Sequence, residues 1–135
     1  MSTMATNYNG ITLYYNSQTS LGKQILAYTE TSEKKIRSVD ISKTKVTGTQ
    51  WASIAYNLNI KLEEIVNREH PDFQAKYSET TNLSQDDWIK ILQANPATVK
   101  CSVLINKNSF NLIKTPSEVI KILEGESEDF DARNP

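Results

Sequence analysis

The fold is decided by one stretch near the C-terminus, CSVLINKNSFNLIKTPSEVIKIL, residues 101–123. Two short apolar runs, Cys101 to Asn106 and Phe110 to Ile113, are separated by a polar turn, which predicts a β-hairpin. A helix should follow from Thr115-Pro116-Ser117-Glu118, where the threonine can cap, the proline suits the first turn and the glutamate can complete a capping box. The stretch therefore predicts a hairpin and then a helix that packs on the sheet.

The N-terminal part predicts a β-α-β unit. The β-branched and aromatic run Ile11-Thr12-Leu13-Tyr14-Tyr15 is typical of a strand. Apolar side chains then recur at helical spacing from Leu21, so we expect a helix to about Thr31, with Thr19 or Ser20 as its N-cap. A second strand is expected at residues 36–41, which closes the unit.

The middle of the chain, from Thr49 to Ala94, is predicted to be helical almost throughout, as an insert between the two parts of the sheet. Its two tryptophans, Trp51 and Trp88, lie on apolar stripes at helical spacing, so we expect them in the core of the insert. Ser84 stands where the last helix of the insert should begin.

Length and composition favour one domain of 11–124 with a helical insert at 49–94, preceded by a flexible leader at 1–10 and followed by an acidic, disordered tail at 125–135. The 15 basic and 16 acidic residues nearly balance, which argues against direct nucleic-acid binding. Apolar runs are too short to span a bilayer and no signal-peptide pattern is present, so a cytoplasmic protein is expected. One cysteine and one histidine argue against an intramolecular disulfide and a transition-metal site.

The order β-α-β, helical insert, β-hairpin and final helix predicts an α/β fold of the thioredoxin-like, glutaredoxin-like kind, with a mixed four-stranded sheet. The first strand with Asn16 resembles that of the arsenate reductase (ArsC) family related to glutaredoxin, which also includes the Spx transcriptional regulators. In that family a His-Pro pair, an Arg-Pro followed by three apolar residues, and Arg-Pro-Ser-Glu-Val occur in order, and this chain has similar segments at Asn95-Pro96, Val103-Leu104-Ile105 and Thr115 to Val119. The resemblance covers residues 11–123.

This resemblance implies a cysteine between the first strand and first helix that attacks arsenate and passes the adduct to glutathione. Thr19 stands at that position, and a threonine hydroxyl cannot form and break S–S or S–As bonds. The residues that would align with the family's oxyanion-binding arginines and its cis-proline also differ: they are Cys101, Ser102, Thr115 and, in the insert, Asn67, with Arg68 one position away.

Three groups of residues have both a functional and a plain structural interpretation. Thr19, Ser20 and Lys23 at a helix start can bind a small anion such as phosphate, sulfate or a carboxylate, or the threonine or serine can simply cap the helix. Cys101 is either a displaced reactive thiol or a small hydrophobe in a strand. His70 beside Pro71 is expected at a surface or a helix end, rather than as a general base.

We therefore expect an arsenate reductase/Spx-like protein that has lost thiol-redox catalysis and acts by binding a small anion or a protein partner, without a cofactor or metal. Resemblance to Spx suggests RNA polymerase as a partner by analogy alone. The alternative is a glutathione/glutaredoxin-linked arsenate reductase, or a related thiol oxidoreductase, that uses Cys101.

Overall fold

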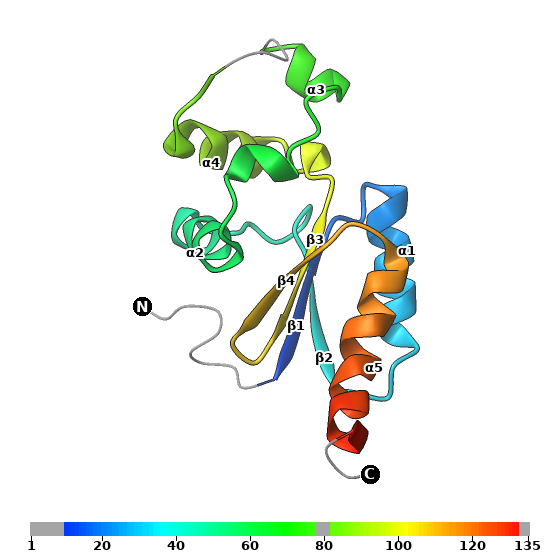
Figure 1. Ribbon diagram of the computed structural model, residues 1–135. Helices are drawn as coiled ribbons and strands as arrows, with labels where there is room; N and C mark the ends of the chain where they lie inside the picture. Colours follow the sequence, from blue (N-terminus) through cyan, green and yellow to red (C-terminus); the bar gives the residue numbers. More distant parts are fainter. Residues whose placement is uncertain (1–9, 78–81, 133–135) are drawn as a thin grey trace.

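The computed structural model describes residues 10–77 and 82–132, with side chains as far as Glu124. Its centre is a four-stranded sheet in the order β2-β1-β3-β4 (Figure 1). Strand β1 (Ile11–Tyr15) pairs in parallel with β2 (Ile36–Asp40) and antiparallel with β3 (Ser102–Asn106), and β3 pairs antiparallel with β4 (Ser109–Ile113). This is the mixed four-stranded sheet that the sequence predicts.

Helices α1 (Ser20–Glu30) and α5 (Pro116–Ala132) cover one face of the sheet side by side (Figure 1). Because successive side chains of a strand point to opposite faces, Leu13 and Leu104 lie under these helices while Tyr14 and Val103 lie on the other face. The predicted capping acid of α5 is confirmed, since the Glu118 carboxylate accepts from the Thr115 backbone N–H at 2.9 Å. The core on this side consists of Ile11, Leu13, Ile25, Leu104, Ile113, Val119 and Leu123.

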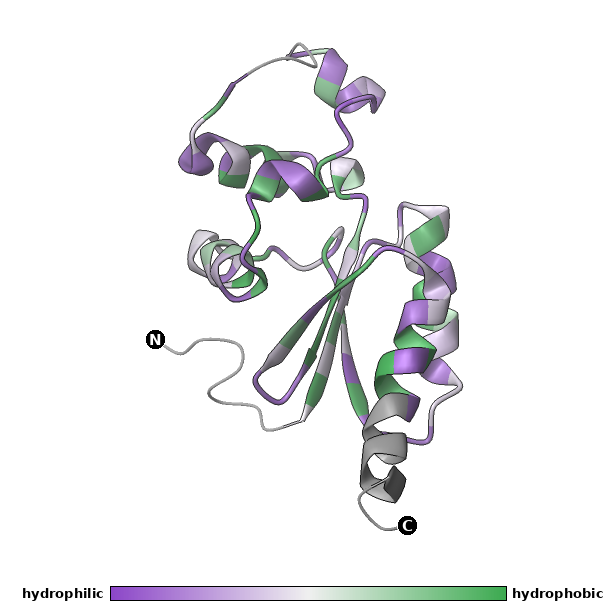
Figure 2. Cartoon of the chain, in the orientation of Figure 1, coloured by the Kyte–Doolittle hydropathy of each residue, from purple (hydrophilic) through white to green (hydrophobic). Residues whose placement is uncertain are grey.

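The insert consists of α2 (Gly48–Leu58), the 3₁₀ turn η1 (Leu62–Ile65), α3 (Pro71–Gln74), α4 (Gln85–Ala94) and the 3₁₀ turn η2 (Pro96–Thr98). Helix α2 packs against β4 on the opposite side of the sheet from α1 and α5, and α3 and α4 lie beyond the end of the sheet (Figure 1). Apolar residues recur along these helices (Figure 2), and they form one buried cluster with Tyr14, Val103 and Ile105 of the sheet. Trp51 and Trp88 are each 3% exposed, so the prediction that both belong to the core of the insert is confirmed. Ser84 caps α4 at the predicted start of that helix, through a capping box with Asp87.

The expectation that the insert is helical almost throughout is wrong between α2 and α3. Asn59 ends α2 in the left-handed conformation, with φ of 57°. Beyond η1 the chain is extended, where Val66 forms a β-bridge with Val99 and the Lys100 N–H donates to the Ile65 carbonyl at 2.9 Å. The apolar spacing fitted a helix, but the backbone groups here bond to a segment more than thirty positions away in the sequence.

The last helix also differs from expectation, because residues 125–132, assigned above to an acidic tail, continue α5 to Ala132. Once a helix is formed, each added residue costs little, and glutamate is a good helix former. The leader at residues 1–9 and the tail residues 133–135 lie outside the described residues, so their disorder stays a prediction. Among the described helices, none is long and apolar enough to cross a membrane.

Candidate functional site

The loop between β1 and α1 contains Thr19, the residue at the expected position of a catalytic cysteine. The Thr19 Oγ1 accepts from the Gly22 backbone N–H at 2.9 Å and donates to the Asn16 carbonyl at 3.0 Å. Thr19, and not Ser20, is therefore the N-cap of α1, which confirms one of the two predicted caps. The hydroxyl is used both as donor and as acceptor inside its own loop.

Asn16 ties this loop to the segment that leads into β3. Its side chain is almost fully buried, and the Nδ2 donates to the carbonyls of Pro96 at 2.6 Å and Val99 at 3.1 Å. Its Oδ1 accepts from the Gln18 N–H at 3.0 Å. The structure thus brings together the Thr19 loop and the segment that precedes Cys101, although the two are about eighty positions apart in the sequence.

Gly22 allows α1 to approach this loop closely. A Cβ built at Gly22 would lie 1.9 Å from the carbonyl oxygen of Asn16 and 2.7 Å from its carbonyl carbon. Any other side chain must therefore move the helix or the loop backbone. The sequence interpretation missed this need for glycine at position 22. The only sign of it in the sequence is a glycine in the first turn of a helix, where alanine is preferred by about 1 kcal/mol.

A carboxylate at the end of β2 also lies against the loop. The Asp40 Oδ1 accepts from the Ser17 N–H at 3.2 Å, the Ser42 N–H at 3.0 Å and the Ser42 Oγ at 2.7 Å. Partial burial alone would raise the pKa of Asp40, but hydrogen bonds from Ser17 and Ser42 outweigh it and hold the pKa below its ordinary value. An ionised carboxylate beside this loop disfavours a second anion there.

The hydrogen bonds of the loop leave few donors for the predicted anion site at Thr19, Ser20 and Lys23. The backbone N–H groups of residues 17, 18, 19, 22 and 23 all donate within the protein. In residues 17–23 of the described chain, only the N–H groups of Ser20 and Leu21 have no partner. Ser20 and Lys23 are exposed, and the site remains a prediction.

Cys101 is a free thiol that is 8% exposed, immediately before β3. Burial raises the pKa of this thiol, against the opposing effect of Lys100 and Lys114. A buried cysteine with a raised pKa has little thiolate at neutral pH and reacts slowly. Its environment matches the plain structural interpretation of a small hydrophobe rather than that of a displaced nucleophile.

The remaining aligned positions contribute no free cation to the loop. The Arg68 guanidinium lies 4.9 Å from the ring centroid of Trp88 and pairs with Glu63 at 3.0 Å. Neighbouring Asn67 donates its backbone N–H to the Thr98 carbonyl at 2.7 Å. Both residues therefore serve the packing of the insert.

The last two residues considered from the sequence are Ser102, at the family's cis-proline position, and His70. Ser102 is buried at the start of β3, and no peptide bond among the described residues is cis. His70 caps α3, with its Nδ1 accepting from the Asp72 N–H at 3.0 Å, so the expected helix-end histidine is confirmed. Within the described segments, no three His, Cys, Asp or Glu side chains gather as metal ligands would.

Comparison with known proteins identifies the fold through solved structures. No protein-family model matches the chain, and no curated protein matches it by sequence. Solved structures do: a putative arsenate reductase from Yersinia pestis has a TM-score of 0.70 and 15% identity over 82% of this chain and 98% of its own. Arsenate reductase from Vibrio cholerae has a TM-score of 0.72 and 14% identity over 86% and 99%. A possible arsenate reductase from Streptococcus mutans has a TM-score of 0.65 and 17% identity over 84% and 99%. At these identities the likeness establishes the fold, which is the thioredoxin-like arsenate reductase fold predicted from the sequence.

Proposed function

We propose that this chain uses the arsenate reductase fold for binding rather than for thiol-redox catalysis. The observation that carries the proposal is the closed cap at Thr19, whose hydroxyl bonds to Asn16 and Gly22 where the resemblance implies a reactive thiolate. Only a cysteine can supply a thiolate, and the single cysteine of the sequence, Cys101, is buried and has a raised pKa.

The charge beside the loop supports the same proposal. Reduction of arsenate requires that an oxyanion with negative charge approach the nucleophile, and cationic donors favour that approach. In this chain the charged side chain that bonds to the loop is an anion, the carboxylate of Asp40 at the end of β2, which accepts from the Ser17 N–H. Arg68, one position from an expected arginine, stacks on Trp88 and pairs with Glu63.

A coupled assay with arsenate, glutathione, glutaredoxin and a glutathione-recycling system tests the loss of catalysis. We expect NADPH consumption equal to that of the blank for both the wild type and Cys101→Ser, with an active arsenate reductase as the positive control. Turnover by the wild type that disappears in Cys101→Ser would show a thiol oxidoreductase that uses Cys101, and would overturn the proposal.

Restoring the thiol tests how much of a catalytic site survives. Thr19→Cys places a sulfur where the hydroxyl now caps α1. We expect at most a trace of turnover, because Asp40 still repels the oxyanion. Turnover in Thr19→Cys that rises further in the double variant with Asp40→Asn would support the charge argument, while full activity with Asp40 intact would contradict it.

The proposal favours a protein partner as the bound molecule, because the Asp40 carboxylate disfavours the alternative, a small anion at Thr19, Ser20 and Lys23. RNA polymerase remains an analogy with Spx, and a cytoplasmic location is part of the same proposal. Thermal melting in millimolar phosphate or sulfate tests the anion, because a ligand that binds only the folded state raises its stability. Lys23→Ala should reduce any rise, and a melting temperature independent of both anions would remove the anion from the proposal.

A further inference from the structure

Strand β2 forms an edge of the sheet that the rest of the described chain leaves open. It is the outermost strand on its side, and it packs mainly on β1 and α1 (Figure 1). None of its five residues is buried, whereas four of the five residues of β1 and of β3 are. The other outer strand, β4, is contacted by both α2 and α5. We call the outer side of β2 with its flanking loops, residues 33–45, the β2 edge.

Backbone groups of β2 point outward along this edge. The Ile41 N–H, directly after the strand, donates to the Tyr15 carbonyl at 2.9 Å. Alternate residues of a strand bond to the same neighbour, so Arg37 and Val39 bond to β1 as Ile41 does. The N–H and C=O of Ser38, an exposed residue between them, therefore face outward, where no strand of the described chain lies. A row of such groups can pair with the backbone of an added strand.

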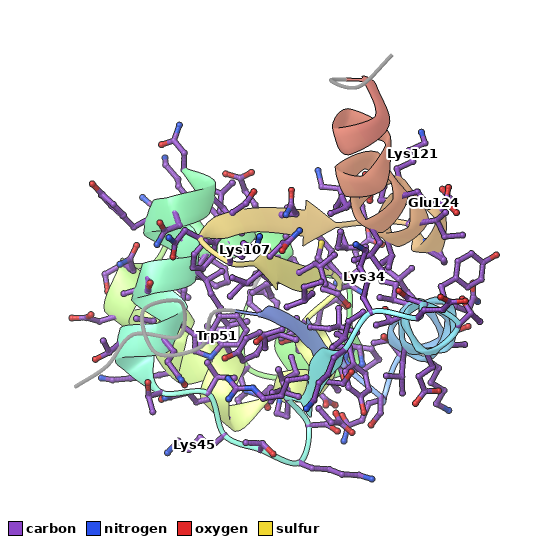
Figure 3. The ribbon with its side chains drawn as sticks, turned by 90° about the horizontal axis from the view of Figure 1, so that it is seen from below. Lys34, Lys45, Trp51, Lys107, Lys121 and Glu124 are labelled. Atoms are coloured by element: carbon purple, nitrogen blue, oxygen red, sulfur yellow. The ribbon has the colours of Figure 1, made fainter. Side chains whose placement is uncertain are left out.

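The charged side chains around the β2 edge are mostly cationic. Residues 33–45 contain five basic and two acidic residues, a net charge of +3 in a chain of net charge −1. Figure 3 shows Lys34 on the loop before β2 and Lys45 projecting outward from the loop after it. The basic residues are Lys34, Lys35, Arg37, Lys43 and Lys45, and all but the half-buried Lys34 are exposed. Positive charge therefore flanks β2 at both ends.

The neighbouring carboxylates do not cancel this charge. The Asp40 Oδ1 accepts from Ser17 and Ser42, which hold it toward the loop between β1 and α1. Glu33 lines a shallow groove between α1 and α5. Counting Glu30, the last residue of α1, still leaves a net charge of +2. The described charges at the β2 edge thus favour a negatively charged partner.

Three of the cations carry the argument. Lys34 and Arg37 already interact within the chain. The exposed lysines Lys35, Lys43 and Lys45 form no ion pair with a described residue. One of them precedes β2 and two follow it, so an extended segment laid along β2 meets a lysine at either end.

We propose that the β2 edge binds an acidic, extended segment of a partner protein as an added strand. The backbone of that segment bonds to Ser38 and its neighbours in β2, and carboxylates at its two ends face the flanking lysines. Strand β2 has five residues and is about 17 Å long, so a segment of about eight residues reaches the lysines at both ends. This proposal deepens the proposed function, on which it rests for the view of the chain as a binding protein.

Two other occupants are disfavoured. A second copy of this chain would bring two β2 edges of net charge +3 together, and lysines beside an edge strand are a common protection against such self-pairing. A nucleic acid would meet the lysines, but its backbone has no alternating N–H and C=O groups to pair with those of Ser38. Both occupants are distinguished by the experiment.

A fluorescent peptide of about eight residues is the probe, with two glutamates at each end and alternating threonine and valine between them. By fluorescence anisotropy we expect saturable binding to the full chain that weakens as salt rises. One control peptide has lysines in place of the glutamates, and we expect it not to bind. A second keeps the glutamates but carries N-methyl groups on its central residues, which removes the backbone donors. We expect this peptide to bind at least roughly tenfold more weakly, because charge alone does not form a strand.

Matched variants of the chain locate the binding. Ser38→Pro removes the outward N–H, and proline is tolerated on an edge strand where that N–H does not bond to the neighbouring strand. Lys43→Glu with Lys45→Glu reverses the charge after β2, whereas Lys61→Glu with Lys90→Glu makes the same change at exposed positions of the insert. We expect Kd to rise at least roughly tenfold in Ser38→Pro and in the β2-edge pair, and to stay unchanged in the insert pair. Circular dichroism melts verify folding, and the lysine pairs and the N-methylated peptide decide the result if Ser38→Pro does not fold.

The proposal is overturned by an absence of binding at millimolar peptide, by equal binding of the N-methylated peptide, or by equal Kd in the β2-edge and insert pairs. Tighter binding of a single-stranded oligonucleotide than of the glutamate peptide would overturn it in favour of a nucleic acid. A dimer in sedimentation velocity that Ser38→Pro makes monomeric would overturn it in favour of a second copy.

The arsenate assay separates this proposal from the proposed function. No turnover and no peptide binding would remove the β2-edge proposal and leave the loss of catalysis in place. Turnover together with peptide binding would remove the loss of catalysis and leave the β2 edge as a binding surface.

Discussion

Replacing Gly22 with alanine tests the close approach on which the candidate site depends. In an ordinary helix this change stabilises a protein, because alanine is the better helix former by about 1 kcal/mol. At position 22 the new Cβ would lie 1.9 Å from the carbonyl oxygen of Asn16. Asn16 is buried, and hydrogen bonds from its Nδ2 and to its Oδ1 fix its position. Relief requires movement of the α1 backbone away from the end of β1.

The expected magnitude follows from these opposing effects. Overpacking against backbone that cannot yield costs about 3 kcal/mol, and subtracting the propensity gain of about 1 kcal/mol leaves about 2 kcal/mol of net destabilisation. For a domain of this size that lowers the melting temperature by about 8 °C. Urea titration followed by tryptophan fluorescence measures the free energy of unfolding, and thermal melting gives the second value.

Gly48→Ala is the matched control. It also lies in the first turn of a helix, but a Cβ there meets only the Ile89 Cγ2 at 3.5 Å, an ordinary van der Waals contact. We expect Gly48→Ala to be neutral or slightly stabilising. If Gly22→Ala is as stable as the wild type or as Gly48→Ala, the inferred close approach of α1 to Asn16 is refuted.

Four further outcomes follow from the same loop and its neighbours. Thr19→Ala should cost about 1 kcal/mol in urea titration through loss of the N-cap, while Thr19→Ser should cost little; equal losses would show that the cap is unimportant. Asn16→Ala should cost about 2 to 3 kcal/mol, because two buried carbonyls lose their donor, and a change within error would contradict that role. Because the pKa of Asp40 is lowered in the folded protein, its carboxylate stabilises the fold at neutral pH, and this contribution should disappear as the pH falls below about 4. Asp40→Asn should therefore flatten the plot of unfolding free energy against pH in that range. An unchanged slope would argue against a stabilising role for the Asp40 carboxylate. Cys101 should react with a thiol reagent far more slowly in the folded protein than in urea, and equal rates would show that the thiol is accessible.

Local patterns in the sequence determined most of the fold. The hairpin at 102–113, the cap at Thr19 and the acid at Glu118 are interactions between residues a few positions apart, so spacing alone identifies them. The aligned replacement of a cysteine by Thr19 was also visible in sequence, and with it the hypothesis of a non-catalytic protein. The predicted anion site was visible only as residue types at a helix start, because the sequence does not show which backbone N–H groups already have acceptors.

Tertiary structure alone decided which distant residues complete the loop. The amide of Asn16 reaches carbonyls 80 and 83 positions away, Asp40 bonds to the Ser17 N–H 23 positions away, and Val66 pairs with Val99 where a helix was expected. No periodicity records such contacts, because they depend on how separate elements dock rather than on the geometry of one element. The chain's own sequence thus determined that a threonine stands where a thiolate was expected and that its hydroxyl caps the helix locally. The docking of β2 and of the segment before β3 decided which distant groups bond to Asn16 and Ser17 beside it.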